Sequence, residues 1–195
     1  MSQQYPLSSD DILNHPLLAK YPVNVIGYSE LNRFRTIDQL FGGKTVVILL
    51  YNTKSVGNGH WVILIKHVPE CNECTRNGSN FGPTGKRKDC PRGVIEYFDS
   101  YGSSIDFILS LQDRAKRFRL NQATAKLSHL LGNSPYCIVC NDQVLQREGA
   151  AVETCGYHCL ARLRHRHLDV DDYVRRLLAT GNPDKAVVDM YHQSV

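Results

Sequence analysis

Two neighbouring apolar runs decide the fold of this chain: KTVVILLYN at residues 44–52 and HWVILIKHV at residues 60–68. Each has the length of a strand and is rich in valine, isoleucine and leucine, which predicts β-strands buried in the core. The turn SVGNG between them favours an antiparallel pair. Further along the chain, VIEYFDSYG at 94–102 and YCIVCN at 136–141 predict two more strands.

Helical patterns surround these strands. Short helices are expected at 8–21 and 36–43, where Ser, Asp and Thr can cap the helix start. Further helices are expected at 104–118, at 121–133, from Cys155 onward, at 169–181 and at 182–193. These elements predict an α+β protein with a small mixed or antiparallel central sheet flanked by helices. We expect a single domain over residues 1–195, with a Cys-rich insertion at about 69–93.

The composition is that of an ordinary globular protein. The 195 residues are 42% hydrophobic and 22% charged, and the formal net charge is +4. That charge suits weak attraction to phosphate or acidic surfaces, and it suits ordinary solvated charge equally well. The first residues lack a basic region followed by an apolar run, and the longest apolar stretches are far too short to span a bilayer. We therefore expect an intracellular protein that does not enter a membrane.

The cysteines are a second constraint. There are seven of them, an odd number, and in a reducing compartment a disulfide framework is the less favoured explanation. Metal binding or catalysis should account for some of them. The stretch ETCGYHCLARL at residues 153–163 places Cys155 where a helix is expected to begin. A helix N-terminus favours the thiolate, so Cys155 is a candidate nucleophile, with a buried apolar role as the alternative.

A nucleophilic cysteine needs a base, an orienting carboxylate and an oxyanion donor. His60 opens a predicted strand after a Gly-rich turn and is the best candidate base. Asp99 closes the predicted strand at 94–102 and could orient His60. Asp99 is favoured over Glu96, since strand alternation would turn Glu96 toward the opposite face. Gln146, in the loop before the helix, could supply an oxyanion donor.

Taken together, the segments GHW, FDSYG, NDQVLQ and TCGYH resemble the adenain-like cysteine proteases, which include the adenovirus maturation protease and are related to SUMO-specific proteases. The chain order His, Asp, Gln, Cys distinguishes this group from papain-like enzymes. The match covers roughly residues 44 to 165 and is closest to the maturation proteases of virophages and Maverick/polinton elements. The resemblance implies His60 as base, Asp99 as third member of the triad, Gln146 as oxyanion donor and Cys155 as nucleophile.

The same resemblance implies a function. The chain should be a viral cysteine endopeptidase that cleaves capsid or scaffold precursors through a thioester acyl-enzyme, with glycine preferred before the scissile bond. It should work as a monomer in the host cytoplasm or viral factory and in the virion. The chemistry requires no cofactor, although DNA or a peptide could act as an activator. Removal of a ubiquitin-like modifier is chemistry that the same scaffold supports.

The sequence departs from the family pattern in two places. The spacing from Gln146 to Cys155 is longer than usual, which leaves Gln143 as a substitute oxyanion donor. The span from His60 to Asp99 is also long, because the Cys-rich insertion lies within it.

That insertion carries Cys71, Cys74 and Cys90, with His67 shortly before them. Thiolates at such spacing suit a tetrahedral structural Zn²⁺, with His67 as a fourth ligand. The alternative is a loop with free thiols, because the second half of a paired CxxC motif is missing. The alternative to a protease from another functional class is a zinc-knuckle nucleic-acid-binding protein, in which Cys155 is only a core residue.

Four further features of the sequence each allow a structural and a functional interpretation. Cys137, Cys140 and Cys159 are expected to pack in the core. His158 is a rival base but ranks below His60, because it lies on the same helix as Cys155. The run RLRHRH at 162–167 is expected to be a solvated basic helix face rather than a nucleic-acid site.

Trp61 is the fourth of these features. It follows His60 directly, and large aromatic side chains usually pack in the core. It could instead form a wall beside the nucleophile, which would leave room for glycine in an extended substrate.

Overall fold

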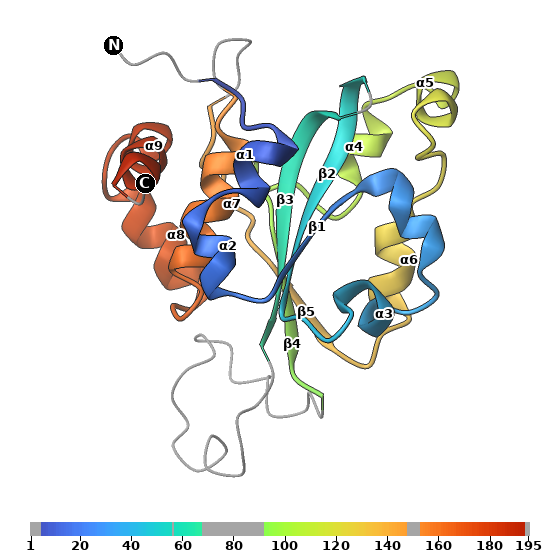
Figure 1. Ribbon diagram of the computed structural model, residues 1–195, viewed down its shortest axis with the longest axis horizontal. Coiled ribbons are helices and arrows are strands. Elements are labelled where there is room, and N and C mark those ends of the chain that lie inside the picture. Colours follow the sequence, from blue (N-terminus) through green and yellow to red (C-terminus); the bar gives the residue numbers. More distant parts are fainter. Residues whose placement is uncertain (1–4, 56, 68–91, 148–152, 194–195) are drawn as a thin grey trace.

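A five-stranded mixed sheet forms the centre of the protein (Figure 1), with its strands in sequence order across the sheet. The computed structural model describes residues 5–55, 57–67, 92–147 and 153–193. The strands are β1 (Val23–Gly27), β2 (Val46–Ser55), β3 (Asn58–His67), β4 (Val94–Phe98) and β5 (Cys137–Cys140). The three central strands, β2 to β4, are antiparallel to one another, whereas β1 pairs with β2 and β5 pairs with β4 in parallel.

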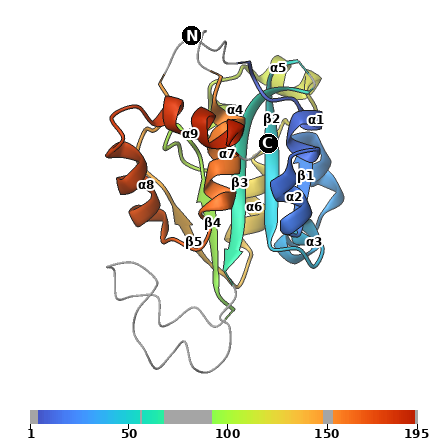
Figure 2. The ribbon, with the colours of Figure 1, turned by 60° about the vertical axis from the view of Figure 1, so that its left-hand side comes forward.

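Helices cover both faces of this sheet, so the described residues form three layers (Figures 1 and 2). One face is covered by α1 (Ser9–Leu13), α2 (Pro16–Lys20), α7 (Cys155–Arg164), α8 (Val170–Leu178) and α9 (Pro183–His192). The other face is covered by the 3₁₀ helix η1 (Tyr28–Arg33), α3 (Ile37–Phe41), α4 (Phe107–Ser110) and α6 (Lys126–Gly132). The short helix α5 (Arg114–Arg119) buries none of its side chains.

The central strands are continuously apolar because both of their faces are buried. Alternate residues of β2 enter two separate cores: Val46, Ile48 and Leu50 pack with the α7 side, while Val47, Leu49 and Tyr51 pack with the α3 side. Successive side chains of a strand point to opposite faces, so a strand between two helical layers has no polar face. The mixed sheet flanked by helices that the sequence predicts is confirmed at this level.

The structure differs from the prediction at the N-terminal end of the sheet. β1 was not expected, since its sequence VNVIG is short and its five residues are only partly buried. Its polar residue has a structural role, because the Asn24 side chain donates hydrogen bonds to the carbonyls of Leu40 and Phe41 at 3.0 and 3.1 Å. β1 is thereby joined to the end of α3 as well as to β2.

Two predicted helices are each broken into two. The helix expected at 8–21 divides at His15, because Pro16 occupies the first position of a new helix and has no N–H to continue the previous one. The helix expected at 104–118 divides before Asp113, whose side chain caps α5 by accepting from the Lys116 N–H at 2.7 Å. Capping residues start helices, and both breaks follow from that property.

The predicted solvated face at 162–167 is wrong for Arg162. Its side chain is completely buried and donates to both carboxylate oxygens of Glu96, at 2.6 and 2.7 Å. The remaining donors reach the carbonyls of His165 and Leu168. A buried charge needs a partner of opposite sign, and the partner lies on a strand far away in sequence. The basic run therefore anchors α7 to β4.

Removing one member of this pair should destabilise the fold strongly. Arg162→Ala leaves the Glu96 carboxylate buried without its cation, and we expect a loss of about 3–5 kcal/mol in the free energy of unfolding. Urea denaturation measures this loss. The matched control is Arg175→Ala, which removes an exposed pair with Asp172 and should cost less than about 1 kcal/mol. Equal losses in the two variants would contradict the anchoring role.

No helix within the described ranges is both long and apolar enough to cross a membrane.

Candidate active site

His60 lies near the start of β3, where this strand approaches β2 unusually closely. His60 pairs with Tyr51, and Gly59 pairs with Asn52 beside an irregularity in the ladder. A Cβ atom on Gly59 would lie 1.7 Å from the carbonyl oxygen of Tyr51, so only glycine fits at this position. The glycine before His60 therefore lets the chain place the imidazole near the end of the central strand.

Asp99 lies directly after β4 and faces this imidazole. His60 Nε2 donates to Asp99 Oδ1 at 2.8 Å, and both side chains are almost completely buried. The same oxygen accepts from the Tyr101 N–H at 2.8 Å. The preference for Asp99 over Glu96 agrees with this geometry, because Glu96 points toward α7 and pairs with Arg162.

Cys155 is the first residue of α7, as the sequence predicts, with Thr154 as the N-cap residue. The Cys155 side chain is one of the groups that act on the pKa of His60, and because Nε2 faces Asp99, Nδ1 is the ring nitrogen open to a thiol. Burial lowers the pKa of His60, but the hydrogen bonds to Asp99 and Cys155 outweigh it and raise the pKa to about 10. The raised pKa of His60 keeps its ring protonated at neutral pH.

Gln146 is buried against the loop that carries Asp99. Its backbone N–H donates to the Ser100 carbonyl at 2.9 Å, and its side-chain oxygen accepts from the Ser100 hydroxyl at 2.8 Å. Its amide nitrogen donates to the Tyr101 hydroxyl at 3.1 Å. Gln143, the alternative, has an exposed side chain that bonds its neighbour Asp142. The geometry therefore favours Gln146 as the glutamine of this site.

Two residues of the site were missed in the sequence. The Tyr101 ring stacks on His60 with 4.8 Å between centroids. Asn141 holds the backbone of Asp99 from both sides, accepting from its N–H at 2.9 Å and donating to its carbonyl at 2.8 Å. The available signals were weak: an aromatic residue in a turn after a strand, and an asparagine directly after another strand.

The remaining candidates take structural positions. Trp61 is 3% exposed and packs in the core, and its indole N–H donates to the Leu7 carbonyl at 3.0 Å. Cys159 is buried in the same core, as expected. His158 is fully buried and bonds Asp184, and burial lowers its pKa. His158 is thus engaged by Asp184, whereas His60 contacts Asp99.

The other cysteine predictions have mixed outcomes. The expected core role of Cys137 and Cys140 is wrong: Cys137 is half-buried and disulfide-bonded, and Cys140 is exposed. The strand β5 is at the edge of the sheet, where a side chain has no second strand to cover it. The zinc candidates Cys71, Cys74 and Cys90 lie outside the described residues. His67, the suggested fourth ligand, is described, and its Nε2 lies 3.1 Å from Glu96 Oε2.

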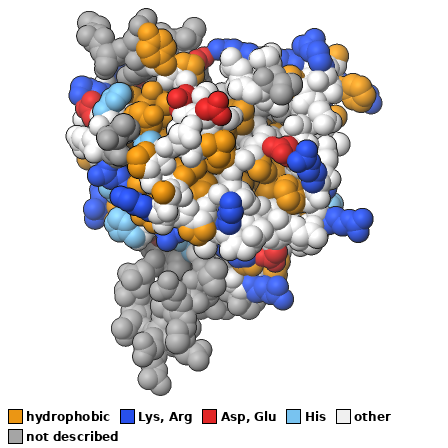
Figure 3. Space-filling model, in the orientation of Figure 1, with side chains coloured by type: hydrophobic (Ala, Val, Ile, Leu, Met, Phe, Trp, Pro, Cys, Tyr) orange, Lys and Arg blue, Asp and Glu red, His pale blue; other side chains and the backbone are white. Residues whose placement is uncertain are grey.

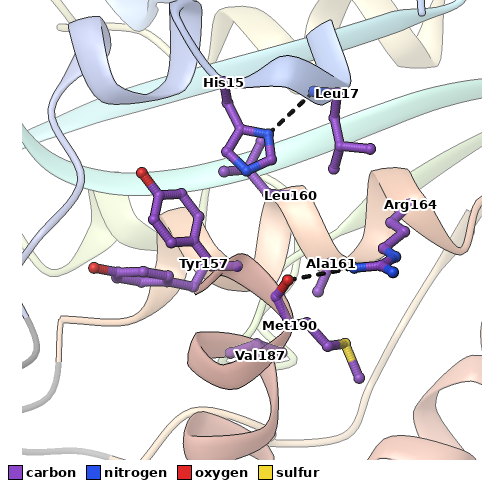
Figure 4. A pocket seen from close by; sticks show the side chains of 9 residues that line it. His15, Leu17, Tyr157, Leu160, Ala161, Arg164, Val187 and Met190 are labelled. Carbon is purple, nitrogen blue, oxygen red and sulfur yellow. Dashed lines mark hydrogen bonds between the residues drawn. The ribbon is translucent and has the colours of Figure 1, made fainter. Parts of the chain in front are cut away.

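A small pocket lies beside α7 but apart from the catalytic candidates. Figure 4 shows its lining, which comes from α2, α7 and α9 and includes His15, Tyr157 and Arg164. His15 Nδ1 accepts from the Leu17 N–H at 3.2 Å. The lining contains none of His60, Asp99, Gln146 and Cys155. On the face shown in Figure 3, Lys and Arg side chains lie in small separate groups rather than in one patch.

Comparison with known proteins places the chain among virus-related sequences. No family model matches it. It is 28% identical to the protein described as "Uncharacterized protein V9" of Sputnik virophage, over 171 residues that cover 88% of this chain and 82% of the relative. The chain is therefore related to a virophage protein.

Proposed function

We propose that this protein is an adenain-like cysteine endopeptidase that processes a viral capsid or scaffold precursor. The observation that carries the proposal is the buried imidazole of His60, which contacts the carboxylate of Asp99 at 2.8 Å and whose pKa is raised in part by the Cys155 side chain at the start of α7. A nucleophile, its base and an orienting group in hydrogen-bond contact are the parts that covalent acyl transfer requires.

These groups support a balanced reaction in two halves. In the proposed first half, the thiol proton of Cys155 passes to His60 and the thiolate sulfur attacks the carbonyl carbon, whose oxygen takes up the π electron pair beside the Cys155 N–H and the Gln146 amide. As the C–N bond breaks, the proton on His60 moves to the leaving nitrogen and a thioester remains. Water then gives a proton to His60 and attacks the thioester, which releases the thiolate and the new carboxyl group.

The substrate class rests on the relationship to a virophage protein and on the resemblance of the site segments. We propose an extended precursor segment with glycine before the cut, as the resemblance of the site segments implies. An extended segment gains main-chain hydrogen bonds along its length. Cleavage only at the C-terminus of a folded modifier would instead favour the modifier-removing function.

The test is labelling with a thiol-directed peptide electrophile, followed by mass spectrometry of the modified residue. The chain contains its own control, because the free thiol of Cys140 is exposed while that of Cys155 is only 6% exposed. Labelling governed by exposure would mark Cys140 first. A peptidase reacts selectively at Cys155, and selective labelling of Cys140 alone would reject the proposal.

Gln146→Ala should lower kcat for a precursor peptide by about 10²–10³-fold, the usual loss for one oxyanion donor. Gln143→Ala should leave kcat unchanged, because that side chain is exposed and bonds only its neighbour among the described residues. Steady-state kinetics on the two variants compare the candidates directly. A larger loss in Gln143→Ala would reverse the assignment.

The pH profile of kcat/KM should have an unusually late alkaline limb. Because the pKa of His60 is raised to about 10, its ring keeps the proton that the leaving amine needs through neutral and mildly alkaline pH. Activity should fall only as the pH rises through about 10. In Asp99→Asn the fall should begin at lower pH, since a cause of the raised pKa is gone. A wild-type fall near the ordinary value of 6.5 would contradict the prediction.

A further inference from the structure

Asp184 is a buried carboxylate whose partners all lie on another part of the chain. It is the second residue of α9 and is 4% exposed. Its Oδ2 accepts from the Arg147 N–H at 3.1 Å. Its Oδ1 accepts from the Thr154 hydroxyl and from His158 Nε2, the latter at 3.2 Å.

Two of these partners flank the groups assigned to the reaction. Arg147 follows Gln146 in sequence, and Thr154 precedes Cys155. One carboxylate therefore joins the chain directly after the proposed oxyanion donor to the chain directly before the proposed nucleophile. Because the third partner, His158, lies one turn into α7, the same carboxylate also fixes the helix that presents the thiol.

Asp184 is not needed to begin its own helix. The N-cap of α9 is Asn182, whose side chain accepts from the Lys185 N–H at 3.2 Å. The carboxylate of Asp184 instead turns toward α7 and the segment before it. Burying such a charge is costly unless donors compensate it, and the donors supplied here belong to the candidate site.

We infer that Asp184 is a positioning residue for the proposed acyl transfer. It fixes the positions of Gln146 and Cys155 relative to each other through its bonds to Arg147, Thr154 and His158. This inference rests on the proposed function. The hydrogen bonds of Asp184 go to Arg147, Thr154 and His158, which flank or follow the reacting groups, so its role is to position them. Catalytic groups have to be held within a fraction of an ångström, and a misplacement of about 1 Å can cost about 10²-fold in rate.

The test uses Asp184→Asn. The asparagine side chain has the shape of aspartate, but its NH₂ group cannot accept the hydrogen bond that one carboxylate oxygen accepts. We expect kcat to fall by about 10²-fold while KM stays within about 3-fold. Rates are expressed per active site titrated with the peptide electrophile, so that loss of folded protein does not count as loss of kcat. Thr154→Val, which removes a single donor, should lower kcat by about 10-fold and keeps the test usable if Asp184→Asn folds poorly.

Two comparisons separate positioning from a merely structural role. Asp189→Asn changes an exposed carboxylate on the same helix, paired with Lys185, and should leave kcat unchanged. In the double variant Asp184→Asn/Gln146→Ala, the fall in kcat should be at least about 10-fold smaller than the product of the falls in the two single variants. This is expected because both changes disturb the same group of interacting residues. Fully multiplying losses, or an Asp184→Asn rate equal to that of Asp189→Asn, would overturn the inference while leaving the protease proposal intact. A wild-type protein without Cys155-dependent cleavage would overturn both.

Discussion

Cys155→Ala is expected to lower kcat/KM for a precursor peptide by about 10⁴-fold or more, because no other group in the site can form the thioester. The fold should persist, since the change removes one sulfur atom at the start of α7 and leaves the Thr154 cap in place. Cleavage is measured by mass spectrometry of the products, and folding by the thermal unfolding midpoint.

The control is Cys140→Ala, which changes an exposed free thiol and should cleave at the wild-type rate. If the Cys155→Ala protein still cut the precursor, Cys155 would be a core residue and not the nucleophile. An equal loss of kcat/KM in Cys140→Ala would indicate Cys140, at the end of β5, as the nucleophile.

His60→Ala should be nearly as severe, with kcat falling by about 10³–10⁴-fold. The loss has two physical causes: the thiol loses the base that ionises it, and the leaving amine loses its proton source. Steady-state kinetics measure the fall. Because the variant also leaves the Asp99 carboxylate buried without a partner, the free energy of unfolding should be measured on the same protein.

Two further variants are compared with His60→Ala for their effect on kcat. Asp99→Ala should be milder than His60→Ala, since the carboxylate orients the imidazole but forms no bond to the substrate. His129→Ala removes an exposed histidine on α6 and should have no effect on kcat. If Asp99→Ala were more damaging than His60→Ala on folded protein, the assignment of base and orienting group would need revision.

The parts of the site that local pattern controls could be predicted from the sequence. Strand alternation separated Asp99 from Glu96, and the structure places Asp99 on His60 and Glu96 on Arg162. The transition from loop to helix located Cys155 at the first position of α7. Each of these inferences needs only a short window of residues, because period and capping are local properties.

The parts that depend on distant contacts could not be predicted in this way. Arg162 looks like one more charge in a basic run until Glu96 lies opposite it. Asn141 looks like a loop residue, although it holds the backbone of Asp99. The short strand β1 is defined by its pairing with β2 rather than by its own composition. In each case tertiary packing, not intrinsic preference, decides the role.

The strand β3 separates the candidate site from the segment 68–91. One end of the strand carries His60, and the other end is His67, while the chain is described again from Arg92. Seven residues of strand place these two ends roughly 23 Å apart, and β4 returns from Val94 to deliver Asp99 beside His60. Both borders of residues 68–91 therefore lie at the end of the sheet remote from the imidazole. A reporter peptide inserted between those borders would therefore join the chain at the end of the sheet remote from His60.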